Sequence, residues 1–219
     1  KYSILFSKSF DFLGINNLFL TFKNIILPAG ISFYTFQTLS FTIDTFRGKI
    51  NKIPSLIDYL LYVCYFPQLV AGPILRPQEF FNNTAIPFLN KNKSNFKKGF
   101  TRVCFGLFLK LCLADELSIF NDVAFSSNFY NLGFLDAWTM AFGFGLQIYF
   151  DFSAYSHMAI GISNIIGLPI KENFIFPYSS KSVSEFWKRW HISLSLWVSD
   201  YLYKFLNSKI TKYWLGIFP

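Results

Sequence analysis

Long uncharged stretches alternate with short basic segments along most of the chain. Residues 24–43, 59–75 and 152–170 contain no Asp, Glu, Lys or Arg. About 20 consecutive apolar residues in a helix match the thickness of the hydrocarbon core of a bilayer. The pattern therefore predicts an all-α polytopic membrane protein, with its first clear transmembrane helix over residues 24–45.

The apolar stretch at residues 57–70 is interrupted by helix breakers. Pro67 lies inside it, and Gly72 and Pro73 follow closely. Basic residues flank the stretch on both sides, whereas the two ends of a crossing helix normally differ in Lys and Arg content. A helix broken at membrane depth must be sheltered by protein or line a wet cavity. We expect this segment to be re-entrant. Its turn is either purely structural, or its exposed backbone amides hold a phosphate or carbonyl oxygen.

The segment 133–168 is too long for one upright transmembrane helix. It would measure about 54 Å, against about 30 Å of hydrocarbon. From position 137 onward its only charge is Asp151, and a carboxylate at this depth is costly unless it faces a cavity or finds partners. The sequence predicts a break or bend between Phe150 and Ser156, with Asp151 turned away from lipid. Asp151 is either a structural acid paired with a neighbouring basic residue or a cavity residue, with Tyr155 one turn further on.

Two other segments contain polar or charged residues that a simple lipid-facing transmembrane helix would lack. Residues 3–22 are apolar with polar interruptions, and we expect an interfacial helix or the end of a preceding span. Residues 96–124 predict a long helix that carries interior charges at Arg102, Lys110, Asp115 and Glu116.

Residues 182–204 predict an amphipathic helix. Ser182 and Glu185 have the spacing of a capping box, so the helix is expected to begin there. At about 100° per residue, one apolar face is formed by Trp187, Trp190, Leu194, Trp197, Val198 and Tyr201. Because charged residues occupy the opposite face, we expect this helix to lie along the membrane or dip into it rather than cross it.

His191 lies at the border between the two faces of this helix. It follows Trp187 by one turn and precedes Ser195 by one turn, with Trp190 beside it in the sequence. The near-neutral pKa of an imidazole suits acid–base chemistry on a hydroxyl group. The alternative is an interfacial helix rich in tryptophan, in which His191 is only a structural residue.

Composition narrows the classes of function. Charged residues make up 15% of the chain and apolar residues 53%, whereas a soluble domain has about 25% charged residues. The net charge of +8 comes from basic residues between the apolar blocks, as in loops of membrane proteins, so nucleic-acid binding is not expected. The cysteines are scattered and argue against a disulfide framework or a zinc site; they are Cys64, Cys104 and Cys112.

Several short motifs follow one another along nearly the whole chain. They occupy residues 27–37, 66–76, 147–156, 172–174, 186–195 and 200–203, and include Phe-Trp-Lys-Arg-Trp-His at 186–191. Together and in this order they resemble the membrane-bound O-acyltransferase family. The similarity is greatest to the bacterial branch with alginate O-acetyltransferases and the D-alanine transfer protein of teichoic acid modification, and the alginate type is the more similar of the two.

The resemblance implies a many-helix membrane fold around a tunnel, with broken or re-entrant helices, of which residues 1–219 form one partial domain. It makes His191 the catalytic base or an orienting group that faces an interior cavity. It places Asp151 and Tyr155 in the tunnel wall, and the remaining candidate substrate residues are Trp187, Trp190 and Ser195. The family has a second, principal histidine in a Trp-His-Gly-like motif, expected downstream of Pro219. Because the chain begins at Lys1 rather than Met, we expect an internal fragment that lacks this histidine.

The activity implied by the resemblance is transfer of an acetyl or similar acyl group toward hydroxyls of an exported cell-surface polysaccharide such as alginate. The expected donor is acetyl-CoA or another acyl thioester, with no bound cofactor and no metal. Expected partners are the lipid bilayer, the polysaccharide acceptor and a separate periplasmic or extracellular acetyltransferase, in the bacterial inner membrane. The alternative from another class is a transporter or channel subunit, since broken helices and a buried acid also mark ion pathways.

Overall fold

The computed structural model describes residues 30–50, 52–84, 93–126 and 133–204, and every regular element in these ranges is helical. The all-α prediction is thus confirmed for this part of the chain. The helices are α2 (Ile31–Phe46), α3 (Leu56–Val63), α4 (Pro77–Thr84), α5 (Lys93–Phe108), α6 (Asp115–Ser126), α7 (Phe134–Ile166), α8 (Val183–Arg189) and α9 (Ile192–Trp197). Shorter or wider helical turns are η2 (Phe66–Gln68), η3 (Leu109–Ala114), η5 (Pro177–Ser179) and η6 (Val198–Tyr203).

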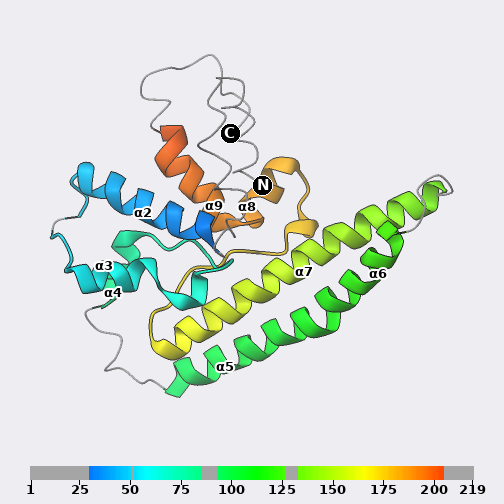
Figure 1. Ribbon diagram of the computed structural model, residues 1–219, viewed down its shortest axis with the longest axis horizontal. Coiled ribbons are helices and arrows are strands. Elements are labelled where there is room, and N and C mark those ends of the chain that lie inside the picture. The colour runs from blue at the N-terminus through cyan, green and yellow to red at the C-terminus, as the bar shows by residue number, and fades with distance from the viewer. Residues whose placement is uncertain (1–29, 51, 85–92, 127–132, 205–219) are drawn as a thin grey trace, which may run out of the picture.

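Two groups of helices lie side by side (Figure 1). One is a long antiparallel pair in which α5, η3 and α6 run as one rod along α7. The other is a compact group of α2, α3 and α4, and the α8–α9 segment lies above both groups in this view. Among the described residues, none of the helices combines the length and the hydropathy that a membrane crossing requires.

Most of the predicted segments have a counterpart. The first predicted transmembrane helix corresponds to α2, although residues 24–29 lie outside the described ranges, as does the segment 3–22. The interruption near Pro67 is confirmed, because α3 ends at Val63 and the chain turns through η2 before α4 begins. Whether this segment re-enters a membrane stays a prediction.

The predicted break in α7 is wrong. This helix runs for 33 residues without interruption, through Asp151 and Tyr155 (Figure 1). It contains no proline, and the carboxylate finds a partner without any break, since Lys110 Nζ lies 2.7 Å from Asp151 Oδ1. The irregularity lies in the neighbouring rod, where η3 is π-helical and brings Lys110 between Asp151 and Asp115, 2.8 Å away.

The pairing of Asp151 with a neighbouring basic residue is the structural alternative considered for this acid. Its side chain remains 56% exposed. The continuity of α7 and the surface pairing of Asp151 weaken the transporter hypothesis, since the buried acid and one of the two broken helices on which it was based are not present.

α5 and α7 approach each other backbone to backbone at Gly99 and Gly161. A Cβ added at Gly161 would lie 2.7 Å from the Gly99 carbonyl oxygen and 2.7 Å from Val103 Cγ2. Small residues allow this close approach of helices, which is common in membrane proteins. The contact fixes how α7 lies against α5, and α7 in turn carries aromatic side chains toward α8 and α9.

The α2–α4 group is joined to the rest by a buried core and by buried polar pairs. Tyr62 is fully buried, and its hydroxyl donates to the Leu75 carbonyl oxygen at 3.0 Å. On α2, the buried carboxylate of Asp44 accepts a hydrogen bond from the Tyr201 hydroxyl at 2.6 Å. One turn earlier, Ser40 Oγ accepts from Trp197 Nε1 at 2.7 Å. These pairs hold η6 and the end of α9 against α2.

Replacing Tyr201 with phenylalanine is expected to destabilise the fold by about 1–2 kcal/mol, because the buried Asp44 oxygen loses its donor. The measurement is thermal unfolding of the detergent-solubilised full-length protein. Tyr203→Phe is the matched control, since its hydroxyl makes no hydrogen bond within the described residues. Equal losses in both variants would contradict the assigned role of the Asp44 contact.

Candidate active site

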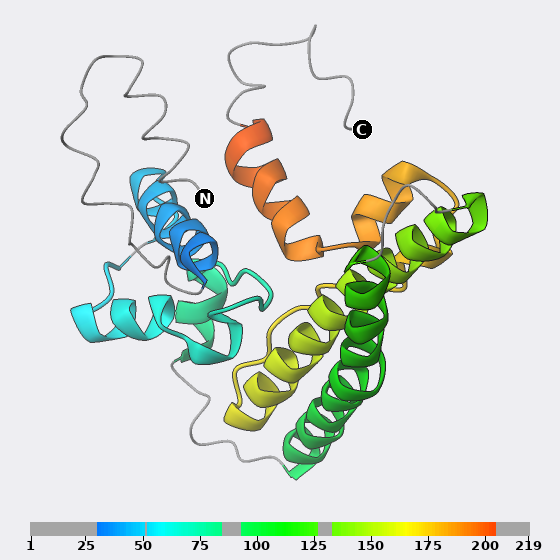
Figure 2. The ribbon, with the colours of Figure 1, turned by 45° about the vertical axis from the view of Figure 1, so that its right-hand side comes forward.

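The helix that starts at Ser182 begins as predicted but ends early. Ser182 Oγ accepts a hydrogen bond from the Glu185 amide at 3.1 Å. The helix then stops at Arg189, Trp190 is extended, and His191 adopts the left-handed conformation with φ 45° and ψ 53°. The prediction of one continuous amphipathic helix is therefore wrong. α8 and α9 leave this turn in different directions (Figure 2).

The turn at His191 is produced by the loop that precedes α8. The Ile175 amide donates to the Arg189 carbonyl at 3.0 Å, and the Ile192 amide donates to the Asn173 carbonyl at 3.0 Å. The chain on both sides of Trp190 thus pairs with the loop instead of continuing its own helical ladder. A left-handed residue other than glycine costs about 1–3 kcal/mol, and such strained positions persist only where surrounding contacts hold them.

The imidazole of His191 lies against two phenylalanine rings. The Phe152 ring of α7 meets it edge to face at 4.7 Å between centroids, and the Phe174 ring lies nearly parallel at 6.5 Å. Its Nε2 atom is buried and has no hydrogen-bond partner within the described residues. His191 lies between the two short helices α8 and α9, and burial lowers its pKa to about 4. At pH 7 it is a neutral imidazole, the form that can accept a proton.

Trp190 extends this aromatic wall. Its ring stacks on Phe186 at 5.5 Å and packs against Phe174 at 5.1 Å and Tyr149 at 5.9 Å. Trp187 is 49% exposed and lies outside the wall, apart from an edge contact with Phe186. Of the predicted tryptophans, the structure therefore brings only Trp190 into the environment of His191.

The other predicted site residues have separate neighbours. Ser195 Oγ donates to the Trp187 carbonyl at 3.3 Å, and its amide donates to the His191 carbonyl at 3.1 Å. The Tyr155 hydroxyl accepts from the Val70 amide at 3.3 Å and so joins α7 to the interrupted segment. Asp151 is directed toward η3, whereas the next residue, Phe152, reaches the histidine. The structure does not bring Asp151 and His191 together.

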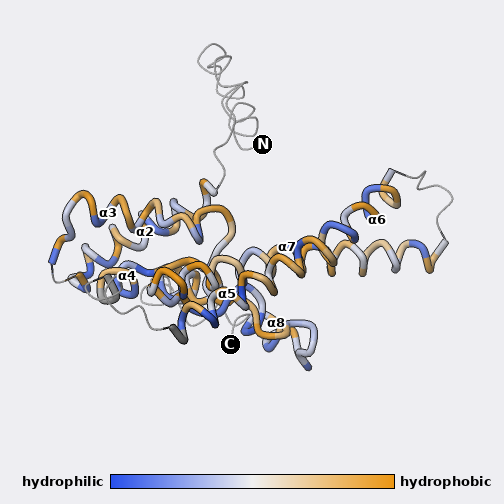
Figure 3. The backbone as a smooth tube through the Cα atoms, turned by 90° about the horizontal axis from the view of Figure 1, so that it is seen from below, coloured by the Kyte–Doolittle hydropathy of each residue, from blue (hydrophilic) through white to orange (hydrophobic). Residues whose placement is uncertain are grey.

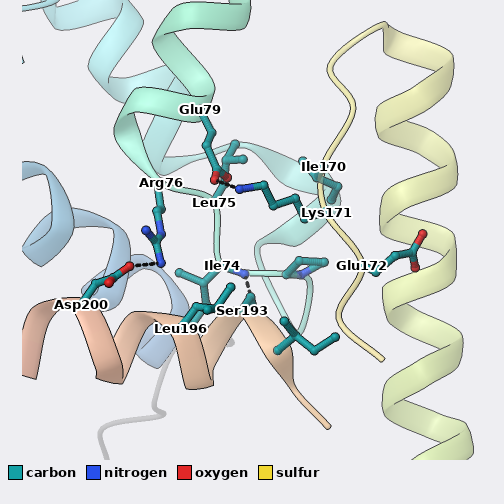
Figure 4. Close-up of a pocket in the computed structure, with 12 residues that line it drawn as sticks. Ile74, Leu75, Arg76, Glu79, Ile170, Lys171, Glu172, Ser193, Leu196 and Asp200 are labelled. Atoms are coloured by element: carbon teal, nitrogen blue, oxygen red, sulfur yellow. Dashed lines mark hydrogen bonds and ion pairs between the residues drawn. The ribbon is translucent and has the colours of Figure 1, made fainter. Parts of the chain in front are cut away.

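A pocket of about 160 Å³ lies beside the turn, between residues 73–76, the loop 170–172 and the start of α9 (Figure 4). Ser193 lines it, and its Oγ accepts from the Ile74 amide at 3.0 Å. Ion pairs border the pocket, between Arg76 and Asp200 and between Lys171 and Glu79. The pocket is lined by Ile192 and Ser193, the residues that follow His191; that His191 itself faces a cavity stays a prediction.

Motifs far apart in the sequence thus meet at one place in the fold: the segment 66–76, the middle of α7, the loop at 172–174 and the turn at 190–193. A family model described as membrane-bound O-acyltransferase family matches residues 6–214. The chain belongs to the membrane-bound O-acyltransferase family. This confirms the resemblance carried by the motifs, and membership makes the chain part of a membrane protein.

Named relatives of this family member are bacterial enzymes. The probable alginate O-acetylase AlgI of Pseudomonas syringae pv. tomato is 44% identical over 87% of the chain and 36% of the relative. The peptidoglycan O-acetyltransferase of Helicobacter pylori is 33% identical over 93% of the chain and 43% of the relative. The teichoic acid D-alanyltransferase of Bacillus subtilis is 28% identical over 88% of the chain and 49% of the relative. The greater similarity to the alginate type is confirmed, and the chain spans about a third of the length of the alginate-type relatives.

Sequence reasoning missed two residues of the site in this family member. Asn173 is fully buried and holds the turn at His191. Glu172 forms an ion pair with Arg102 of α5, whose Nε also donates to His157 Nδ1 at 3.2 Å. The signal was present, since both residues stand in a motif of the family resemblance. Of the two, only Asn173 is buried and anchors the turn, whereas the Glu172 side chain is 43% exposed.

Proposed function

We propose that the protein to which this chain belongs transfers an acetyl or similar acyl group to hydroxyls of an exported cell-surface polysaccharide, such as alginate. Family membership supports acyl transfer, and the names of the relatives specify acetyl or D-alanyl transfer and alginate, peptidoglycan or teichoic acid. The observation that carries the proposal is the neutral, buried His191 with an unpartnered Nε2.

The proposed role of His191 is that of a general base. Its Nε2 accepts the proton of the acceptor hydroxyl while that oxygen attacks the acyl carbonyl of a thioester such as acetyl-CoA. The C–S bond breaks, the sulfur leaves as a thiolate, and the imidazolium returns the proton to it. The rings of Phe152, Phe174 and Trp190 exclude water around the imidazole, which protects a thioester from hydrolysis.

We place the protein in the bacterial inner membrane as a multi-pass protein whose helices surround a tunnel. Support comes from the hydrophobic residues that predominate along much of the rod and α7 (Figure 3), many of whose large apolar side chains are exposed. They include Phe100, Phe105, Leu111, Ile119, Phe142 and Phe144. Exposed apolar surface of this extent is typical of contact with lipid or another apolar partner. A periplasmic or extracellular acetyltransferase that receives the acyl group is part of the same proposal.

The function is tested with membranes from cells that produce the full-length protein. These are incubated with acetyl-CoA labelled in the acetyl group and with deacetylated alginate, and label on the re-isolated polymer is counted. Label that depends on the protein supports the proposal. Transfer to neither alginate nor another envelope polysaccharide, with several acyl thioesters, would reject it.

The pH dependence of this reaction is expected to differ from that of an ordinary histidine. Because the pKa of His191 is lowered to about 4, the imidazole stays neutral as the pH falls from 7 to 5. The rate should therefore be level over this range and drop only near pH 4, whereas an unperturbed histidine would lose activity below about pH 6.5. Initial rates between pH 3.5 and 8, corrected for acyl transfer without protein, make the measurement. A midpoint near 6.5 would show that His191 is not buried in the working enzyme.

A further inference from the structure

Asn173 uses every polar group of its side chain although it lies in a loop. It is fully buried. Its Oδ1 accepts two hydrogen bonds from Ser193, from the amide at 3.2 Å and from the hydroxyl at 2.9 Å. Its Nδ2 donates to Ser156 Oγ on α7 at 3.3 Å, and its main-chain carbonyl accepts from the Ile192 amide at 3.0 Å.

These hydrogen bonds reach the residues that directly follow His191 and leave the histidine itself untouched. The imidazole Nε2 has no hydrogen-bond partner within the described residues, so hydrogen bonds at that atom do not set the direction of the ring. The direction depends on the left-handed backbone of His191 and on packing against Phe152 and Phe174. Asn173 controls both, because it holds the backbone after His191 and is the chain neighbour of Phe174.

Asn173 also connects the turn to the pocket. Asn173 binds Ser193, and Ser193 Oγ accepts a hydrogen bond from the Ile74 amide at 3.0 Å. Ile74 lies on another wall of the pocket (Figure 4). Ile74, Ser193, Asn173 and Ser156 thus form a chain of hydrogen bonds from the interrupted segment across α9 to α7. The turn after His191 is therefore anchored both to the interrupted segment, through Ile74, and to α7, through Ser156.

We propose that Asn173 is a positioning residue that aims the His191 imidazole by fixing the turn between α8 and α9. The inference rests on the proposed acyl transfer and adds to it a residue that touches neither donor nor acceptor. Loss of the amide leaves Ser193 free to move and allows the strained turn to relax. A base displaced by about 1 Å can lose about 100-fold in rate, while substrate binding is affected much less.

The test compares Asn173→Ala, Asn173→Asp and Asn164→Ala in the full-length protein. Asn164 is the matched control, because it lies on α7 and makes no hydrogen bond within the described residues. Asn173→Ala is expected to lower kcat about 100-fold with KM nearly unchanged. Asn173→Asp keeps an acceptor for both Ser193 hydrogen bonds and should recover most of the loss, whereas Asn164→Ala should behave like the parent.

A second readout follows the histidine itself. Diethyl pyrocarbonate modifies accessible imidazoles, and mass spectrometry locates the product. His191 should react faster in Asn173→Ala than in the parent, whereas His157, held by Arg102 of α5, is the internal reference. If Asn173→Ala does not fold, Ser193→Ala applies the same test. It removes the hydroxyl contacts with Asn173 and with the Ile74 amide but keeps the hydrogen bond from its own amide to Asn173, so it should give a smaller loss of kcat.

The outcomes separate the two proposals. Parental kcat and parental His191 reactivity in Asn173→Ala, together with an inactive His191→Ala, would overturn the positioning role and leave acyl transfer standing. A fully active His191→Ala would reject the proposed mechanism whatever Asn173 does. A loss of kcat that Asn173→Asp does not relieve would also count against the inference, since the acceptor oxygen is its essential feature.

Discussion

Replacing His191 with alanine is expected to lower polymer acylation by about two to four orders of magnitude, the usual contribution of a general base. The buried Nε2 has no partner within the described residues, so its removal breaks no hydrogen bond there. The full-length protein should therefore still be produced and inserted in the membrane. The measurement is initial rate of label transfer, normalised to the amount of protein in the membrane.

His191→Gln separates proton transfer from orientation. Glutamine retains a hydrogen-bonding group but does not accept a proton at neutral pH. Loss of activity in both variants indicates proton transfer, whereas activity in the glutamine variant alone indicates that His191 orients a substrate. His157→Gln is the control, because it keeps an acceptor for Arg102 and should remain close to the parent. If His191→Ala acylates the polymer at the parental rate, His191 is only a structural residue of the interfacial segment, which is the alternative considered from the sequence.

Replacing Gly161 with alanine is expected to have the largest effect on stability, about 3 kcal/mol. The new Cβ would lie 2.7 Å from the Gly99 carbonyl oxygen, an atom of the backbone that no change of rotamer can move away. The two helices must separate, and the contact that sets α7 against α5 is lost. We expect a lower yield of monodisperse protein in detergent and a lower melting temperature.

Gly145→Ala on the same helix is the matched control. A Cβ at this position would make only an ordinary van der Waals contact, since its nearest neighbour is the Tyr178 hydroxyl at 3.6 Å. In a helix interior, alanine is favoured over glycine by about 0.5–1 kcal/mol, so this variant should be as stable as the parent or more stable. Equal melting temperatures for the two variants would show that the close approach of α5 and α7 is not maintained in the folded protein.

Some features follow from local patterns alone. The uncharged apolar stretches indicated helices, the spacing of Ser182 and Glu185 located the start of α8, and Pro67 marked the interruption after α3. Each depends on neighbours within a few residues, such as a cap, a missing amide or a period of hydrophobicity. The motifs also determined the family, since they combine residue types in a fixed order.

Other features depend on contacts that no local pattern contains. The sequence predicted a break near Asp151 because the apolar segment is longer than the hydrocarbon core is thick, and the carboxylate at that depth marked the place. In the structure α7 continues without a break, and Lys110, brought close by a π-helical turn, supplies the counter-charge. The sequence also predicted a continuous helix through His191. In the structure, the backbone groups of Arg189 and Ile192 form hydrogen bonds with the loop at Ile175 and Asn173 instead of continuing the helix.

Helical periodicity thus determined which segments are helices and which residues they could bury. The tertiary structure decided where a helix ends against its own propensity, because that depends on whether a distant loop offers better partners to its amides and carbonyls. The position of His191 is one of the features that the tertiary structure decided. Its identity as a candidate base came from the sequence, whereas its strained turn, its aromatic surroundings and its anchor at Asn173 exist only when residues 152, 173 and 191 meet in the fold.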